Sequence, residues 1–90
     1  MSKFTDKTGE KLWELSLEGA LDDEYGDTSE APGRWWGLLT KTGIRGAAHA
    51  IVTQDGQGFV DYEVYPSAKA ARKHFDRIVR EVQAEMGEDD

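Results

Sequence analysis

Two segments in the second half of the chain carry the pattern of a β-hairpin, and this pattern constrains the fold more than any other feature of the sequence. Residues 47–54 and 59–65 are rich in apolar and β-branched side chains and are separated by the turn sequence Asp-Gly-Gln-Gly, an arrangement typical of hairpins. In the second segment Val60, Tyr62 and Val64 alternate with acidic residues. Because successive strand side chains point to opposite faces, the sequence predicts an antiparallel sheet with one clearly apolar face.

The register of this hairpin is open between two alternatives. A loop of two or four residues would turn the odd-numbered residues of the first strand, from His49 to Thr53, toward that apolar face. A three-residue loop with a bulged glycine would instead turn the even-numbered residues, from Ala48 to Val52, toward it and would place His49 opposite Asp61. Register decides which side chains are buried, and we favour the three-residue loop because its apolar face is purer.

The last predicted element is an amphipathic helix. Ser67 is a typical N-cap and Gly87 a typical C-terminal end. At about 100° per residue the apolar side chains share one arc, with Val79 at its edge: Ala71, Phe75, Ile78, Val82 and Met86. The opposite side is basic: Lys69, Lys73, Arg77 and Arg80. We expect the apolar arc to pack across one face of the sheet.

The N-terminal part of the chain can be interpreted in two ways. Residues 13–18 alternate between apolar and polar, which is the period of a half-buried strand. A helix over residues 8–25 is the rival interpretation, but it would turn Leu15 away from the apolar side and place Gly19 in the helix interior, at a cost of about 1 kcal/mol. We favour the strand, although it leaves residues 20–34 as a long connection.

A further predicted strand, over residues 34–42, contains the adjacent tryptophans Trp35 and Trp36. Their side chains must point to opposite faces of the sheet, so only one of them can lie under the C-terminal helix. The other is either exposed, as an interface hot spot, or covered by the acidic loop or the N-terminal segment.

Length and composition fit one small domain of the α+β class. A chain of 90 residues, of which 38% are hydrophobic, buries enough surface for one core and not for two. We therefore predict a single domain over residues 1–90, built from a small antiparallel sheet of three or four strands with the C-terminal helix packed on one face. Residues 1–10 and 87–90 are expected to be flexible.

Several classes of protein are excluded by what the chain lacks. It has no cysteine, hence no disulfide and no thiolate chemistry. No apolar run approaches the roughly 18 residues of a membrane span, and the start does not resemble a secretory signal. We expect a cytoplasmic protein without a membrane partner, as a monomer or homodimer.

The net charge of −7 is unevenly distributed. Residues 1–34 carry −5, whereas residues 66–86, within the predicted helix, carry +2. The densest acidic group surrounds Tyr25 in a segment predicted as a loop: Asp22, Asp23, Glu24 and Asp27. Such a loop can meet a basic partner, with the tyrosine as an aromatic anchor.

No sequence motif indicates catalysis. There is no phosphate-binding loop, no His-Glu-x-x-His and no Gly-x-Ser-x-Gly. The Gly-x-Gly at residues 56–58 precedes a strand, whereas a dinucleotide site needs a helix N-terminus there. His49 and His74 cannot be joined into a metal site from the sequence. We expect no enzyme, no cofactor and no metal.

Two segments resemble a known group of proteins. Gln54–Tyr65 with the helix after it, and Leu21–Asp27 before a tryptophan-rich strand, are similar to parts of small acidic proteins encoded by actinobacterial phages. The resemblance covers about half of the chain. Proteins of this group are mostly uncharacterised accessory factors. The resemblance implies an accessory protein that binds a host or phage macromolecule in the host cytoplasm, and it identifies no site residues.

These observations together favour a non-enzymatic binding module for another protein. The expected contact residues are the acidic group with Tyr25, and Trp35 and Trp36. One alternative is nucleic-acid binding through the basic helix face, with Trp or Tyr stacking on bases, although the net charge opposes it. Another alternative is an acidic mimic of nucleic acid that occupies the basic groove of a protein.

Overall fold

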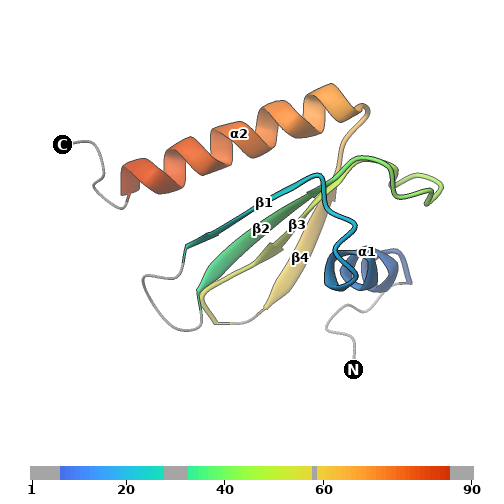
Figure 1. Ribbon diagram of the computed structural model, residues 1–90, viewed down its shortest axis with the longest axis horizontal. Coiled ribbons are helices and arrows are strands. Elements are labelled where there is room, and N and C mark those ends of the chain that lie inside the picture. The colour runs from blue at the N-terminus through green and yellow to red at the C-terminus, as the bar shows by residue number, and fades with distance from the viewer. Residues whose placement is uncertain (1–6, 28–32, 58, 86–90) are drawn as a thin grey trace.

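The protein folds as an antiparallel sheet with a helix at each end of the chain (Figure 1). The computed structural model describes residues 7–27, 33–57 and 59–85. The elements follow in the order α1 (Lys7–Leu17), β1 (Asp23–Asp27), β2 (Arg34–Leu39), β3 (Ala50–Gln54), β4 (Val60–Val64) and α2 (Ala68–Glu85). All neighbouring strands are antiparallel, and their order in the sheet is β1-β2-β3-β4. The predicted α+β class is thus confirmed.

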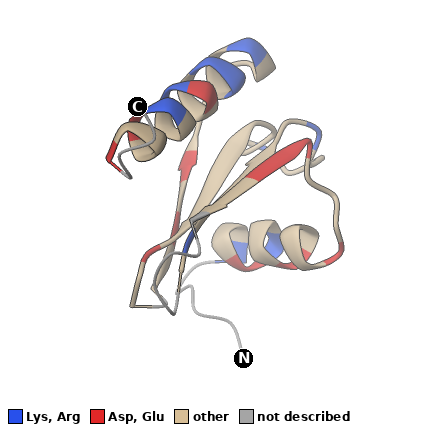
Figure 2. Ribbon diagram, turned by 60° about the vertical axis from the view of Figure 1, so that its left-hand side comes forward, with Lys and Arg blue, Asp and Glu red and all other residues tan. Residues whose placement is uncertain are grey.

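The two helices cover opposite faces of the sheet, so the molecule has three layers (Figures 1 and 2). Between α2 and the sheet lies the α2-side core, whose buried members are Trp36, Leu38, Ile51, Ala71, Phe75 and Val82. Between α1 and the sheet lies the α1-side core, whose buried members are Leu12, Leu39, Ala47, Ala50 and Val52. Alternate residues of β2 and β3 therefore serve different cores, as the period of a strand requires. The expectation that the chain has one core and not two is wrong, because both faces of the sheet are covered by a helix.

Helix α2 forms as its sequence predicts. The Ser67 hydroxyl accepts a hydrogen bond from Ala70 N at 3.1 Å, which confirms the N-cap. The predicted apolar arc faces the sheet, with Ala71, Phe75 and Val82 buried. Met86 and Gly87, the expected end of the helix, lie outside the described residues.

The strand predicted over residues 13–18 is wrong, because residues 13–17 belong to helix α1 and residue 18 lies in the turn after it. Gly19 ends the helix and does not interrupt it. Its φ is +84°, its N–H bonds Ser16 O at 3.1 Å, and Ala20 N bonds Leu15 O at 2.9 Å. This pair of bonds is the Schellman motif, which favours glycine at the left-handed position. Residues 7–10, which belong to the segment expected to be flexible, are part of this helix.

The loop predicted around Tyr25 is wrong as well, because these residues form the edge strand β1. Tyr25 lies opposite Trp36 in the register, and their ring centroids are 6.1 Å apart. This aromatic contact helps to anchor a strand whose other residues are acidic or glycine. Charged side chains suit an edge strand because they discourage pairing with further chains.

The hairpin closes with the favoured three-residue spacing. Asp55 N donates to Phe59 O at 2.9 Å, and Ala50 and Val52 lie opposite Val64 and Tyr62. This confirms that the even-numbered residues of β3 share the apolar face of β4. The predicted pairing of His49 with Asp61 is wrong, since Asp61 lies opposite Thr53. Gly58, the expected bulge, lies outside the described residues.

Gly37 of β2 allows the Trp35 side chain to lie across its own strand. A Cβ at this position would lie 2.4 Å from Trp35 Cη2 and 2.8 Å from Leu21 Cδ2. We expect Gly37→Ala to lower the free energy of unfolding by about 1–3 kcal/mol, as overpacking does, in urea unfolding followed by circular dichroism. Gly26→Ala is the matched control, because its Cβ would make only ordinary contacts from 3.6 Å outward. Equal losses in both variants would contradict this packing.

Candidate functional site

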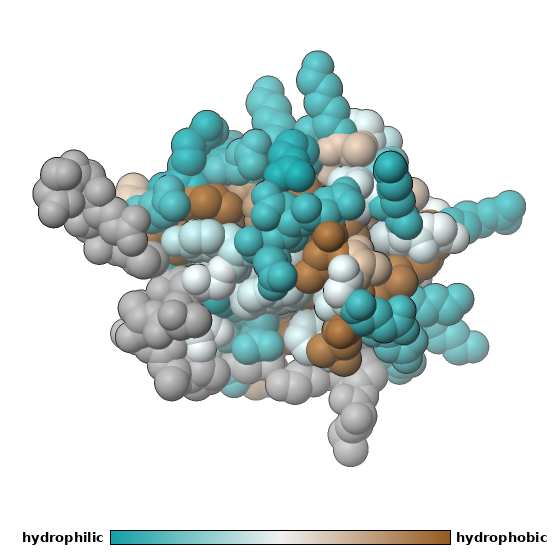
Figure 3. Space-filling model, in the orientation of Figure 1, coloured by the Kyte–Doolittle hydropathy of each residue, from teal (hydrophilic) through white to brown (hydrophobic). Residues whose placement is uncertain are grey.

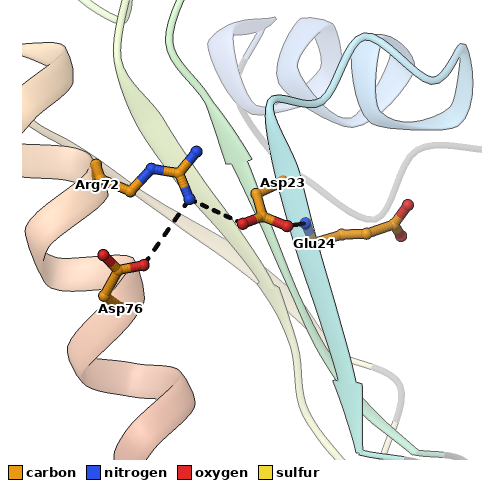
Figure 4. A network of polar contacts seen from close by, with 4 residues as sticks. All are labelled: Asp23, Glu24, Arg72 and Asp76. Carbon is orange, nitrogen blue, oxygen red and sulfur yellow. Dashed lines mark hydrogen bonds and ion pairs between the residues drawn. The ribbon is translucent and has the colours of Figure 1, made fainter.

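The acidic group predicted as a partner-binding loop is divided between the two faces of the sheet. Glu24 faces the α1 side, where its Oε1 accepts a hydrogen bond from Trp35 Nε1 at 3.0 Å. Asp23 turns toward α2, as Figure 4 shows. Asp22 is exposed and precedes β1. The side chain of Asp27 lies outside the described residues.

A cavity of about 220 Å³ opens on the α1 side of the sheet, beside the end of α1. We call it the α1-side cavity. Its walls include Trp13, Leu17, Leu21, Glu24, Trp35 and Gln54. The rings of Trp13 and Trp35 have centroids 6.2 Å apart and planes at 89°, so they form a corner. Among the described residues that line it, only Glu24 carries a charge.

Leu17, at the C-terminal end of α1, is the most exposed large apolar side chain of the described residues, at 71%. In the space-filling view of Figure 3, hydrophobic side chains reach the surface in the region of α1 among hydrophilic ones. Neither Leu17 nor Trp13 was predicted as a site residue. Their spacing of four residues places both on one side of a helix, and only the rival helical interpretation contains that signal.

The expectation that Trp35 and Trp36 point to opposite faces is confirmed. Trp36 belongs to the α2-side core and is 8% exposed, with the Arg34 guanidinium carbon 5.6 Å from its ring centroid. It therefore offers little surface to a partner. Trp35 is half-buried, because the N-terminal segment covers it in part. Of the two predicted tryptophans, Trp35 is the one that lines the α1-side cavity.

On the other face, β1 and α2 border a groove of about 350 Å³. Asp23, Tyr25, Phe75, Asp76 and Arg80 are among its lining residues. At one end Arg72 Nη1 lies 2.8 Å from Asp23 Oδ2 and 3.8 Å from Asp76 Oδ1 (Figure 4). Much of the acidity on this face is therefore already paired within the chain.

The hydrogen bond from Arg72 lowers the pKa of Asp23 below its ordinary value of 3.8. A lowered pKa means that this pair stabilises the fold above about pH 4, and that the contribution disappears as the pH falls through the lowered pKa. Both side chains are nearly half exposed, so the contribution stays below about 1 kcal/mol. We expect Arg72→Gln to raise the pKa of Asp23 in a carboxyl NMR titration. Lys73→Gln should leave it unchanged, and an identical effect of both variants would contradict the assignment.

The four basic residues predicted to line one side of α2 are exposed: Lys69, Lys73, Arg77 and Arg80. Asp76 lies between them in the sequence, however, and Glu81 and Glu85 follow. Figure 2 shows both signs along the helix. Arg77 Nε lies 3.1 Å from Glu81 Oε2, and Arg80 lines the groove beside β1. The positive charge on this side of α2 is thus partly neutralised.

The two histidines lie near Tyr65. The rings of His74 and Tyr65 have centroids 5.3 Å apart, and His49 O accepts a hydrogen bond from Tyr65 N. The Tyr65 hydroxyl donates to Glu63 Oε1 at 3.0 Å, and burial raises the pKa of this tyrosine. Within the described ranges, no group of three or more His, Asp or Glu residues could hold a metal ion.

Comparison with known proteins provides no family for this chain. No protein-family model, no curated protein and no solved structure matches it. Neither of the two described helices is long and apolar enough to cross a membrane.

Proposed function

We propose that this chain is a non-enzymatic binding module that recognises another protein through the α1-side cavity and its rim. The observation that carries the proposal is the hydrogen bond between Trp35 Nε1 and Glu24 Oε1, which places a carboxylate beside a half-buried indole. Tryptophan contributes large contact area at low conformational cost and is enriched in hot spots. Exposed Leu17 adds apolar surface next to it.

The charge of the protein favours a basic partner. The chain carries −7, and acidic positions lie on both edge strands (Figure 2). Opposite charge accelerates the encounter of two proteins and rejects partners of the wrong sign. In line with the resemblance to phage accessory proteins, we propose an actinobacterial host or phage protein in the cytoplasm as this partner.

The test is affinity capture from a nuclease-treated actinobacterial lysate. The variant Asp22→Asn/Glu24→Gln neutralises the β1 side, and Gln can still accept the Trp35 hydrogen bond. We expect the captured protein to bind this variant about tenfold more weakly. The matched control is Asp61→Asn/Glu63→Gln on the opposite edge strand, which should bind normally. Capture of nothing, or equal loss in both variants, would refute the proposal.

The same experiment separates the two alternatives. Binding through the basic face of α2 would make retention depend on nucleic acid and on Lys73 and Arg77. A nucleic-acid mimic would retain a partner whose nucleic-acid binding it blocks. The ion pair between Arg77 and Glu81 weighs against the first alternative, because it lowers the charge available to phosphates.

A further inference from the structure

We infer that the α1-side cavity binds the guanidinium group of an arginine side chain on the partner. The inference rests on the proposed function and specifies the chemistry of its central contact. Its basis is the shape and charge of the cavity walls.

The aromatic walls suit a flat cation. The planes of Trp13 and Trp35 meet at 89°, with centroids 6.2 Å apart. A planar group that stacks on one indole therefore presents its edge to the other. Cations are attracted to the faces of aromatic rings, and to tryptophan most strongly. The space of about 220 Å³ is several times that of a water molecule.

The polar groups of the cavity suit a donor of several hydrogen bonds. Glu24 uses Oε1 for the bond with Trp35 Nε1, and a carboxylate has further acceptor positions on both oxygens. Gln54, at the end of β3, lines the same cavity, and its side chain ends in a carboxamide. A guanidinium donates five N–H groups in a fixed plane, so it can meet both groups while its face lies on an indole.

Other occupants fit these walls less well. An apolar side chain would remove water from the Glu24 carboxylate without replacing its hydrogen bonds, which is unfavourable. A lysine ammonium is a strongly hydrated point charge and cannot stack. Among the described residues that line the cavity only Glu24 is charged, so none of them provides a cation that competes for this carboxylate.

The test uses the whole chain and a small probe, acetyl-arginine amide, at constant ionic strength. The indole N–H resonances of Trp13 and Trp35 are followed by NMR, with buried Trp36 as an internal reference. A ligand of this size should bind with a Kd of the order of 1 mM. We expect saturable shifts of Trp13 and Trp35 and no shift of Trp36.

Three comparisons test whether the cavity recognises the charged, planar guanidinium group. Acetyl-citrulline amide has nearly the same shape without the charge and should bind about tenfold more weakly. The corresponding lysine amide should also bind more weakly than arginine. In Glu24→Gln the preference for arginine over citrulline should disappear, whereas Asp61→Asn should keep it. Equal binding of arginine and citrulline, equal binding of arginine and lysine, or unchanged preference in Glu24→Gln would each overturn the inference.

The two proposals can fail separately. If a captured protein depends on the β1 side while Trp13 and Trp35 do not respond to arginine, the inference alone is wrong. If arginine binds as described but no protein is captured, the proposed function is wrong, and the inference that the cavity binds a guanidinium group still holds.

Discussion

Replacing Phe75 by alanine is expected to lower the free energy of unfolding by about 3–5 kcal/mol. Phe75 is 2% exposed in the α2-side core, where α2 meets Trp36 of β2 and Ile51 of β3. Removal of the ring leaves a cavity that the strands beneath cannot fill by relaxation. Because small domains have only about 5–15 kcal/mol of stability, guanidinium unfolding followed by circular dichroism should show the loss clearly.

Phe59→Ala is the matched control for this variant. Phe59 is the same residue type but is 69% exposed, so its replacement should change the stability by less than about 0.5 kcal/mol. Comparable losses at the two positions would contradict the burial of Phe75 and the packing of α2 on the sheet.

The parts of the fold that the sequence predicts correctly are those fixed by local patterns. Helix α2 has an N-cap at Ser67 and an apolar arc long enough to define its period, and the hairpin has its turn residues between two apolar segments. The opposite directions of Trp35 and Trp36 follow from the geometry of any strand. None of these predictions needs knowledge of a distant contact.

The errors concern segments whose structure depends on distant partners. Residues 13–18 contain too few positions to separate a period of 2 from one of 3.6, and Gly19 counted against a helix that in fact ends there. Strand β1 consists of acidic residues and glycine around Tyr25, and these types are depleted in strands. Its pairing with β2 and the contact between Tyr25 and Trp36 decide its structure.

The candidate site depends partly on local sequence patterns and partly on contacts between distant residues. Composition and spacing draw attention to Glu24 and Trp35, but their mutual hydrogen bond depends on the register of β1 against β2. Trp13 and Leu17 reach the cavity only because α1 covers that face. Gly37, which leaves room for the Trp35 ring, gives no local signal of this role.

Replacing Leu12 by alanine is expected to lower the free energy of unfolding by about 2–5 kcal/mol. Leu12 is fully buried and joins α1 to Leu39 of β2 and to Ala50 and Val52 of β3. If residues 13–18 formed a strand, as the sequence pattern predicts, Leu12 would not belong to a helix that packs on the sheet. A large loss in the free energy of unfolding, measured by urea unfolding, therefore tests helix α1, the element that the sequence pattern predicts wrongly.

Leu17→Ala, in the same helix, separates stability from binding. Because its side chain is exposed, the free energy of unfolding should change by less than about 0.5 kcal/mol. The same change removes one wall of the α1-side cavity, so affinity for a captured partner should fall while the fold persists. Leu12→Ala should instead weaken binding only because helix α1 is no longer docked on the sheet. An added osmolyte favours the folded state. It should therefore restore binding by Leu12→Ala but not by Leu17→Ala. If the osmolyte restored partner binding in both variants, or in neither, the assignment of Leu12 as a packing residue and of Leu17 as a contact residue would be contradicted.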